Sequence, residues 1–118
     1  MINLAIIGSR IFDDYILAKN ILLEIISENN LIINKIISGG ANGSDKIAEK
    51  FAEEFNIDIE VIKPDWKKYG RSAGPIRNSD IIKNSDFIVA FWNGKSKGTL
   101  DSINKAKKLN KELIIKLI

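Results

Sequence analysis

The chain has 118 residues, of which 45% are hydrophobic, and carries a formal net charge of +3. This length suits one domain with a single core, and its apolar runs fall far short of the roughly 20 residues that span a bilayer, so we expect no membrane partner. The absence of cysteine and histidine removes disulfides, thiolate nucleophiles and the commonest metal ligands, so we expect no metal site and no cofactor.

Apolar and β-branched runs predict five strands, and amphipathic segments between them predict helices. In chain order we expect a strand at 2–7, a helix at 13–28, a strand at 35–38, a helix at 44–55, a strand at 58–63, a helix at 75–83, a strand at 87–91, a helix at 99–109 and a strand at 112–117. Strands that alternate with helices pair in parallel through right-handed crossovers. We therefore expect a single α/β domain over residues 1–118, with a doubly wound five-stranded parallel sheet in the order 3-2-1-4-5 and helices on both faces.

The glycines are confined to one predicted edge of the sheet. All eight come after strands: Gly8, Gly39, Gly40, Gly43, Gly70, Gly74, Gly94 and Gly98. At the opposite edge, where helices run into strands, asparagine takes the turn positions that glycine usually occupies. Because tight turns alone would place glycine at both edges, this distribution indicates backbone that approaches a ligand. Ligands of open α/β sheets bind at the carboxyl ends of the strands, where the strand order reverses.

Arginine and tryptophan follow the same partition. The three arginines lie in or beside loops that follow strands: Arg10, Arg71 and Arg77. The planar guanidinium group matches phosphate or carboxylate better than an ammonium does. Trp66 and Trp92 lie at the same edge, where either could stack on a base, although Trp92 could equally cap the core.

Segment 38–45 joins a strand to a helix through a glycine-rich turn. Its unpaired N–H groups and the helix dipole favour an anion, with Ser44 or Asn42 as the helix cap. A simple tight turn is the alternative. Asp45 would stabilise the helix dipole in any case, and a functional Asp45 would hold a ribose hydroxyl.

Two further segments at this edge are candidates for the site. Segment 94–99 begins another helix, with Thr99 as its expected cap, and two neighbouring helix starts would form a phosphate cradle. Segment 65–78 is a long polar loop that leads into a helix, and such loops in compact domains are usually functional. From this helix, Arg77 could reach the loop after the fourth strand.

The lysines are scattered over helices that also carry glutamates. This distribution is typical of solvated surface, so we expect no nucleic-acid partner. The first residues lack the pattern of a secretory signal, and we expect a cytoplasmic protein.

These motifs resemble those of the YspA-like branch of the SLOG superfamily. The superfamily includes the Lonely Guy phosphoribohydrolases, which cleave the N-glycosidic bond of nucleoside monophosphates, and domains that sense ADP-ribose-type signals. The matching segments cover nearly the whole chain in the right order: 8–14, 38–45, 65–70, 73–78 and 98–99. The resemblance implies a Rossmann-like fold, a nucleotide-derived ligand and a homo-oligomer.

The Lonely Guy enzymes use an arginine and a glutamate as their catalytic pair. By motif, Arg77 matches the arginine, whereas Ser102 stands at the glutamate position. Serine cannot polarise water or stabilise an oxocarbenium-like state as a carboxylate does. Asp101 is adjacent, but one residue along a helix rotates a side chain by about 100°; Asp45 is another carboxylate.

We therefore expect a protein that binds a phosphate-bearing nucleotide or derivative, ADP-ribose-like or a nucleoside monophosphate, as a sensor or sequestering protein. The alternative is a nucleotide N-glycosidase that uses Arg77 with Asp45 or Asp101. The expected ligand-binding residues are Gly8, Ser9, Arg10, Ser38, Gly39, Gly40, Asn42, Gly43, Ser44, Asp45, Trp66, Arg71, Arg77, Asn78, Trp92, Lys97, Gly98 and Thr99.

Overall fold

The computed structural model describes residues 1–118. Its elements in chain order are β1 (Ile2–Gly8), α1 (Tyr15–Glu28), β2 (Ile33–Ser38), α2 (Ser44–Glu54), β3 (Asp58–Val61), α3 (Trp66–Tyr69), a 3-10 turn η1 (Gly70–Ser72), α4 (Ala73–Lys83), β4 (Phe87–Trp92), α5 (Lys97–Lys108) and β5 (Glu112–Leu117). Every predicted strand and helix is present. The segment expected to be a loop before α4 instead contains α3 and η1. None of the helices is long and apolar enough to cross a bilayer.

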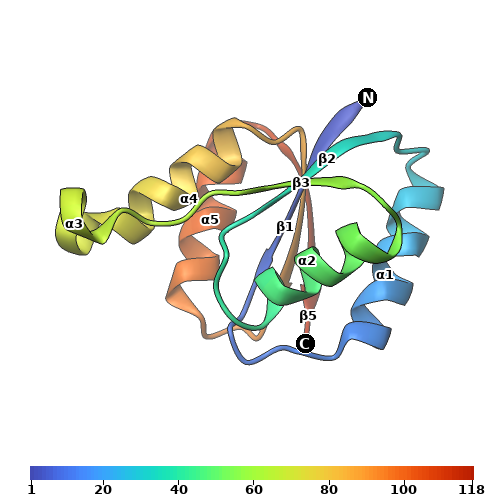
Figure 1. The fold of residues 1–118 in the computed structure, drawn as a ribbon, viewed down its shortest axis with the longest axis horizontal. Helices are drawn as coiled ribbons and strands as arrows, with labels where there is room; N and C mark the ends of the chain where they lie inside the picture. The colour runs from blue at the N-terminus through green and yellow to red at the C-terminus, as the bar shows by residue number, and fades with distance from the viewer.

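The five strands form one parallel sheet in the order β3-β2-β1-β4-β5, as predicted. Helices α1 and α2 cover one face and α4 and α5 cover the other, so the domain has three layers (Figure 1). The strand order reverses between β1 and β4, which lie side by side at the centre. This arrangement is the predicted doubly wound α/β fold.

The two central strands are buried on both faces, which explains their continuous apolar sequences. Along β1, Leu4 and Ile6 pack into the core beneath α1 and α2, whereas Ala5 and Ile7 pack beneath α4 and α5. This alternation follows from the two-residue period of a strand. The two cores hold the ends of β1 and β4 together, and the site is built at those ends.

Turns from helix into strand use asparagine. Asn30, Asn56 and Asn110 have left-handed φ values of 52°, 52° and 54°. Asparagine tolerates this conformation better than most residues. These turns confirm that glycine is not required at the amino edge of the sheet.

Phe51 anchors the core beneath α2, and truncating it tests that core. Phe51 is 1% exposed, whereas its ring neighbour Phe55 is 39% exposed, with 4.7 Å between the ring centroids. We predict that Phe51→Ala lowers the free energy of unfolding by about 3–5 kcal/mol. The control Phe55→Ala should cost about 1–2 kcal/mol, because it loses an aromatic pair and only part of its burial. Urea unfolding followed by circular dichroism measures both, and equal losses would contradict this account of the core.

Candidate functional site

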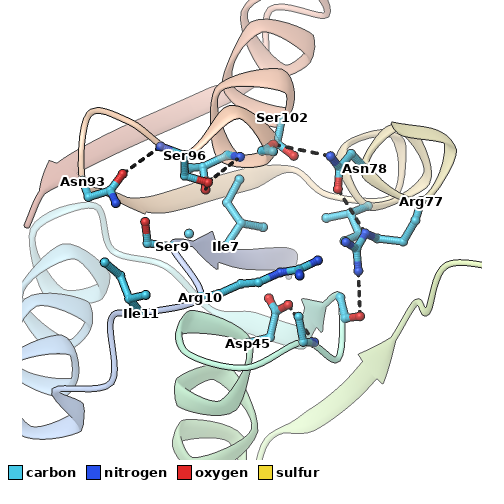
Figure 2. A pocket seen from close by; sticks show the side chains of 16 residues that line it. Ile7, Ser9, Arg10, Ile11, Asp45, Arg77, Asn78, Asn93, Ser96 and Ser102 are labelled. Atoms are coloured by element: carbon cyan, nitrogen blue, oxygen red, sulfur yellow. Dashed lines mark hydrogen bonds between the residues drawn. The ribbon is translucent and has the colours of Figure 1, made fainter. Parts of the chain in front are cut away.

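A cavity of about 400 Å³ opens at the carboxyl ends of β1 and β4. We call it the switch-point cavity, because the strand order reverses there (Figure 2). Its wall comes from the loops after β1, β2 and β4 and from α2, α4 and α5. The lining residues are Ile7, Gly8, Ser9, Arg10, Ile11, Gly39, Ala41, Asp45, Arg77, Asn78, Ile81, Asn93, Ser96, Gly98, Thr99 and Ser102.

A second hollow of about 510 Å³, which we call the Trp66 cavity, adjoins the first. It is lined by Arg10, Gly39, Gly40, Ala41, Asn42, Lys63, Pro64, Trp66 and Arg77. Residues from the loops after β1 and β2 and from α4 belong to both cavities. The two cavities therefore share a wall, and we refer to the pair as the groove at this edge.

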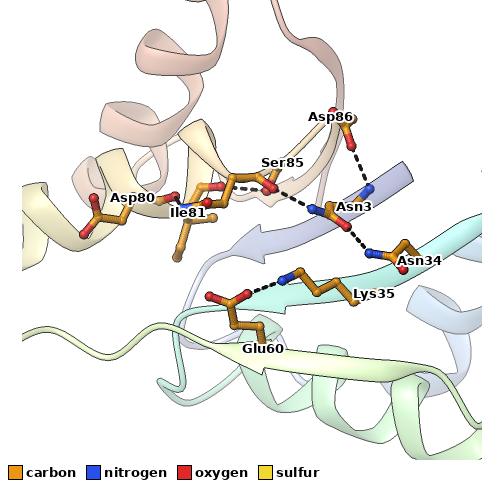
Figure 3. A network of polar contacts seen from close by, with 9 residues as sticks. Asn3, Asn34, Lys35, Glu60, Asp80, Ile81, Ser85 and Asp86 are labelled. Carbon is orange, nitrogen blue, oxygen red and sulfur yellow. Dashed lines mark hydrogen bonds and ion pairs between the residues drawn. The ribbon is translucent and has the colours of Figure 1, made fainter. Parts of the chain in front are cut away.

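The opposite edge of the sheet is closed by its own polar groups (Figure 3). The Asn3 N–H donates to the Asp86 carboxylate at 2.8 Å, and the Asn3 amide donates to the Asn84 carbonyl at 3.0 Å. Asn34 donates to the Asn3 side-chain oxygen at 2.9 Å. These bonds join the amino ends of β1, β2 and β4 and pair polar groups there with one another.

A series of contacts through α4 and α5 fixes the position of Arg77. Its Nη1 donates to the Gly39 carbonyl at 2.8 Å, and its Nε donates to Oδ1 of Asn78 at 3.0 Å. Nδ2 of Asn78 donates to Oδ2 of Asp101 at 3.2 Å, and the same oxygen pairs with Lys105 at 2.7 Å. Asp101 does not line either cavity. Its role in this structure is to hold Asn78, which in turn holds the guanidinium of Arg77.

The cavity has an excess of positive charge. Burial lowers the pKa of Arg77, with the charge of Asp45 raising it and that of Arg10 lowering it. All four ion pairs of the protein use lysines, so neither guanidinium in the cavity is paired with a carboxylate. In Figure 2 the Arg10 side chain extends across the cavity above Asp45. Two arginines without an ion pair around one hollow favour an anionic ligand.

Asp45 points into the switch-point cavity from the first turn of α2. Burial raises the pKa of this carboxyl, although the N–H of Ala41 and the charge of Arg77 lower it. Oδ2 accepts the Ala41 N–H at 2.9 Å. The carboxyl of Asp45 therefore accepts a hydrogen bond from a backbone N–H of the glycine-rich turn, a group that we expected to bind phosphate.

The start of α2 makes other internal bonds as well. The backbone N–H and the hydroxyl of Ser44 both donate to the Ser9 carbonyl, at 3.2 and 3.1 Å. The predicted caps are wrong: the N-cap residue is Gly43, with no side-chain cap, and neither Asn42 nor Ser44 caps the helix. Gly43 has φ 69°, and a Cβ there would collide with the Arg10 carbonyl. This close approach requires glycine at the cap and turns the Ser44 hydroxyl toward the loop after β1.

The start of α5 has a side-chain cap. Its N-cap is Ser96, whose Oγ accepts the N–H of Thr99 at 3.3 Å, so the prediction that Thr99 itself caps the helix is wrong. Oδ1 of Asn93 accepts the N–H groups of the two residues before the helix, at 2.9 and 2.8 Å. The N–H groups of Lys97 and Gly98 find no acceptor in the protein, and Gly98 lines the cavity. The N–H groups of Asn42, Gly43 and Asp45 at the start of α2 are likewise free. Both helix starts therefore keep free donors.

Most of the predicted ligand-binding residues lie in the walls of the two cavities. The six that do not are Ser38, Gly43, Ser44, Arg71, Trp92 and Lys97. Trp92 donates its indole N–H to the Ser96 carbonyl at 3.1 Å and packs on the core beneath α4 and α5, so it caps the core. Arg71 lies exposed on η1.

Sequence reasoning missed several lining residues. They are Ile7, Ile11, Ala41, Lys63, Pro64, Ile81, Asn93, Ser96 and, as part of the wall, Ser102. Ile81 could have been found from its helical spacing, since it lies one turn beyond Arg77. Asn93 directly follows a buried strand, as the glycines of this edge do, so its position in the sequence could have identified it.

Gly39 and Gly98 allow a controlled comparison of alanine substitutions. Neither has a left-handed φ, but only Gly39 has other atoms close to the position of a Cβ. A Cβ at Gly39 would collide with Nη1 of Arg77, whereas a Cβ at Gly98 meets nothing within 4 Å. We predict that Gly39→Ala displaces the guanidinium and lowers the free energy of unfolding by about 1–3 kcal/mol. Gly98→Ala, within α5, should raise it by about 0.4–1 kcal/mol. Urea unfolding measures both, and a stabilised Gly39→Ala would contradict the contact.

Comparisons with known proteins agree with this architecture. A solved X-ray structure, the structural genomics target TM1055, has a similar fold, with a TM-score of 0.66 over 96% of this chain and 72% of that chain at 17% identity. The Gene 61 protein of Mycobacterium phage D29 is 32% identical over 116 residues, which span 92% of this chain and 90% of that protein.

The sequence profile of the YspA, cpYpsA-related SLOG family matches residues 2–69, more than half of the chain. The matched part contains β1, the glycine-rich turn after β2, and Trp66. Together with the similar fold, the match confirms the resemblance inferred from the motifs: the chain belongs to the YspA, cpYpsA-related SLOG family.

Proposed function

We propose that the protein binds a phosphate-bearing nucleotide derivative in the switch-point cavity and acts as a sensor or sequestering protein. Membership of the SLOG family supports a nucleotide-related function. The observation that carries the finer proposal is the pair of guanidinium groups, Arg10 and Arg77, which line one cavity without a carboxylate partner. Such groups bind phosphate through charge-assisted hydrogen bonds.

The phosphate would lie between Arg77 and the start of α5. Asn78 follows Arg77 on α4 and donates to the Gly98 carbonyl at 3.4 Å, which brings the two elements together. The free N–H groups of Lys97 and Gly98 belong to this helix start, and the helix dipole adds a partial positive charge there. The hydroxyls of Ser9 and Ser102 lie in the same cavity and suit the polar groups of a sugar.

Cleavage of an N-glycosidic bond is the second candidate function. Asp45 favours it, because a carboxyl whose pKa is raised by burial can act as a general acid or base. Asp101 is less suited to this role, since its carboxylate is paired with Lys105 and lies outside the cavity. The hydrolase hypothesis therefore depends on Asp45 with Arg77.

Replacing Arg77 tests the binding proposal. Loss of a charged hydrogen-bond donor is worth about 1.5–3 kcal/mol, so Arg77→Ala should weaken ADP-ribose and AMP binding about 10-fold to 150-fold. Arg71→Ala is the matched control, because Arg71 is an exposed arginine outside both cavities. Isothermal titration calorimetry measures all three proteins, and unchanged affinity in Arg77→Ala would contradict the proposal.

The raised pKa of Asp45 predicts how binding depends on pH. Below its pKa the carboxyl is neutral, and above it the carboxylate repels phosphate and offsets the arginines. The affinity for ADP-ribose should therefore fall as the pH rises through this pKa, which lies above the ordinary value of 3.8. ADP-ribose suits the measurement because its diphosphate keeps its charge over this range. Asp45→Asn should bind with little pH dependence, and an equally steep profile for that variant would refute the assignment.

Product analysis separates the two candidate functions. Purified protein incubated with nucleoside monophosphates or ADP-ribose should return them intact by mass spectrometry, with a rise in the protein's melting temperature for any that bind. Release of free base that disappears in Asp45→Asn, but not in Asp101→Asn, would replace the binding proposal by the hydrolase.

A further inference from the structure

The two cavities share four lining residues, which form a common wall, but differ in the chemistry of their other lining residues. Arg10, Gly39, Ala41 and Arg77 line both of them. The switch-point cavity has hydroxyl and amide side chains around its charged residues and no aromatic ring. The Trp66 cavity instead contains an indole, a proline ring and Lys63. A ligand that crosses the common wall would meet two kinds of surface, one suited to a sugar and one suited to a flat aromatic ring.

Trp66 is held in place although it is exposed. Its indole is 55% exposed, and a Cβ at Gly74 would lie 3.7 Å from the ring, so the ring rests beside the first turn of α4. Gly74 and Arg77 are three residues apart on α4 and therefore lie on one side of the helix. Asp65 caps α3 by accepting the Lys68 N–H at 3.1 Å, which fixes the residue before the indole. The open indole thus lies on the side of α4 that carries Arg77, and both residues line the Trp66 cavity.

Lys63 brings a third positive charge to this groove. Its side chain packs over Gly40, since a Cβ at Gly40 would lie 3.3 Å from both Cγ and Cε of Lys63. The ammonium group has no carboxylate partner. With Arg10 and Arg77 on the common wall, the groove has three unpaired cations, and the only carboxyl that lines it is that of Asp45.

We propose that the Trp66 cavity is the subsite for the base of the ligand, and this inference rests on the function proposed above. The base stacks on Trp66, one phosphate lies against Arg10 and Lys63, the linked phosphate lies between Arg77 and the start of α5, and a sugar enters the switch-point cavity. The ligand class is therefore a nucleoside diphosphate joined to a sugar. The two adjoining cavities, of about 400 and 510 Å³, together stay within the range of about 300–1,000 Å³ that sites for whole small molecules occupy.

Two probes that differ in the base test this subsite: ADP-ribose, and ribose 5-phosphate, which lacks a base. Alanine at this position removes the aromatic ring on which the base would stack. Trp66→Ala should therefore weaken ADP-ribose binding about 5-fold to 150-fold. The same variant should leave ribose 5-phosphate binding unchanged, and Trp66→Phe should keep most of the affinity for ADP-ribose. Tyr69→Ala is the control, because Tyr69 is a 40% exposed aromatic residue of α3 that does not line the cavity.

Calorimetry for ADP-ribose and NMR titration for ribose 5-phosphate give the two affinities. Weakening of ADP-ribose alone in Trp66→Ala supports the base subsite. Equal weakening of both probes, or of neither, overturns it while leaving the proposed function intact. Failure of the unaltered protein to bind either probe overturns the proposed function and this inference with it.

Discussion

The hydrogen bond from Arg77 to the carbonyl of Gly39 is the contact on which the site depends. Arg77 belongs to α4, on one face of the sheet, and Gly39 begins the turn that leads to α2, on the other face. The bond spans the carboxyl edge and holds a charged group at the common wall of both cavities. It requires residue 39 to lack a Cβ, because any side chain there would occupy the position of the guanidinium. Asn78 of α4 also accepts a hydrogen bond from Arg77, and Asp101 of α5 holds Asn78 in turn.

The two helix starts at this edge differ in the charge beside them. At both starts some backbone N–H groups are bonded within the chain and others are free: those of Asn42, Gly43 and Asp45 at α2, and those of Lys97 and Gly98 at α5. The carboxyl of Asp45 stands at the start of α2 and, when ionised, repels a phosphate. No carboxylate lines the cavity from α5, whose first turn lines the same cavity as the arginines. This difference favours the start of α5 for the proposed phosphate.

Much of this arrangement could be predicted from the sequence. The apolar runs predicted the strands and their order, and the confinement of glycine and arginine to one edge predicted where the cavity would open. The sequence could not show which N–H groups of the helix starts are bonded, because at α2 this depends on the contact of Ser44 with Ser9, residues 35 positions apart. Nor could it separate Trp66 from Trp92, since the bond from Trp92 to Ser96 depends on the fold of the loop after β4. The place of Arg77 beside a loop that follows a strand identified it as a candidate, but nothing in the sequence indicated the support that Asp101 gives it.

An NMR titration of ¹⁵N-labelled protein with ADP-ribose tests the central claim most directly, because each backbone N–H reports its own hydrogen bond. We predict that the largest amide shifts occur at Lys97 and Gly98, whose N–H groups have no acceptor in the protein. Asn42, Gly43 and Asp45, whose N–H groups also have no acceptor but belong to the turn that holds the Asp45 carboxyl, should shift much less. Larger shifts at these three residues than at the start of α5 would indicate a phosphate at α2 and contradict this account.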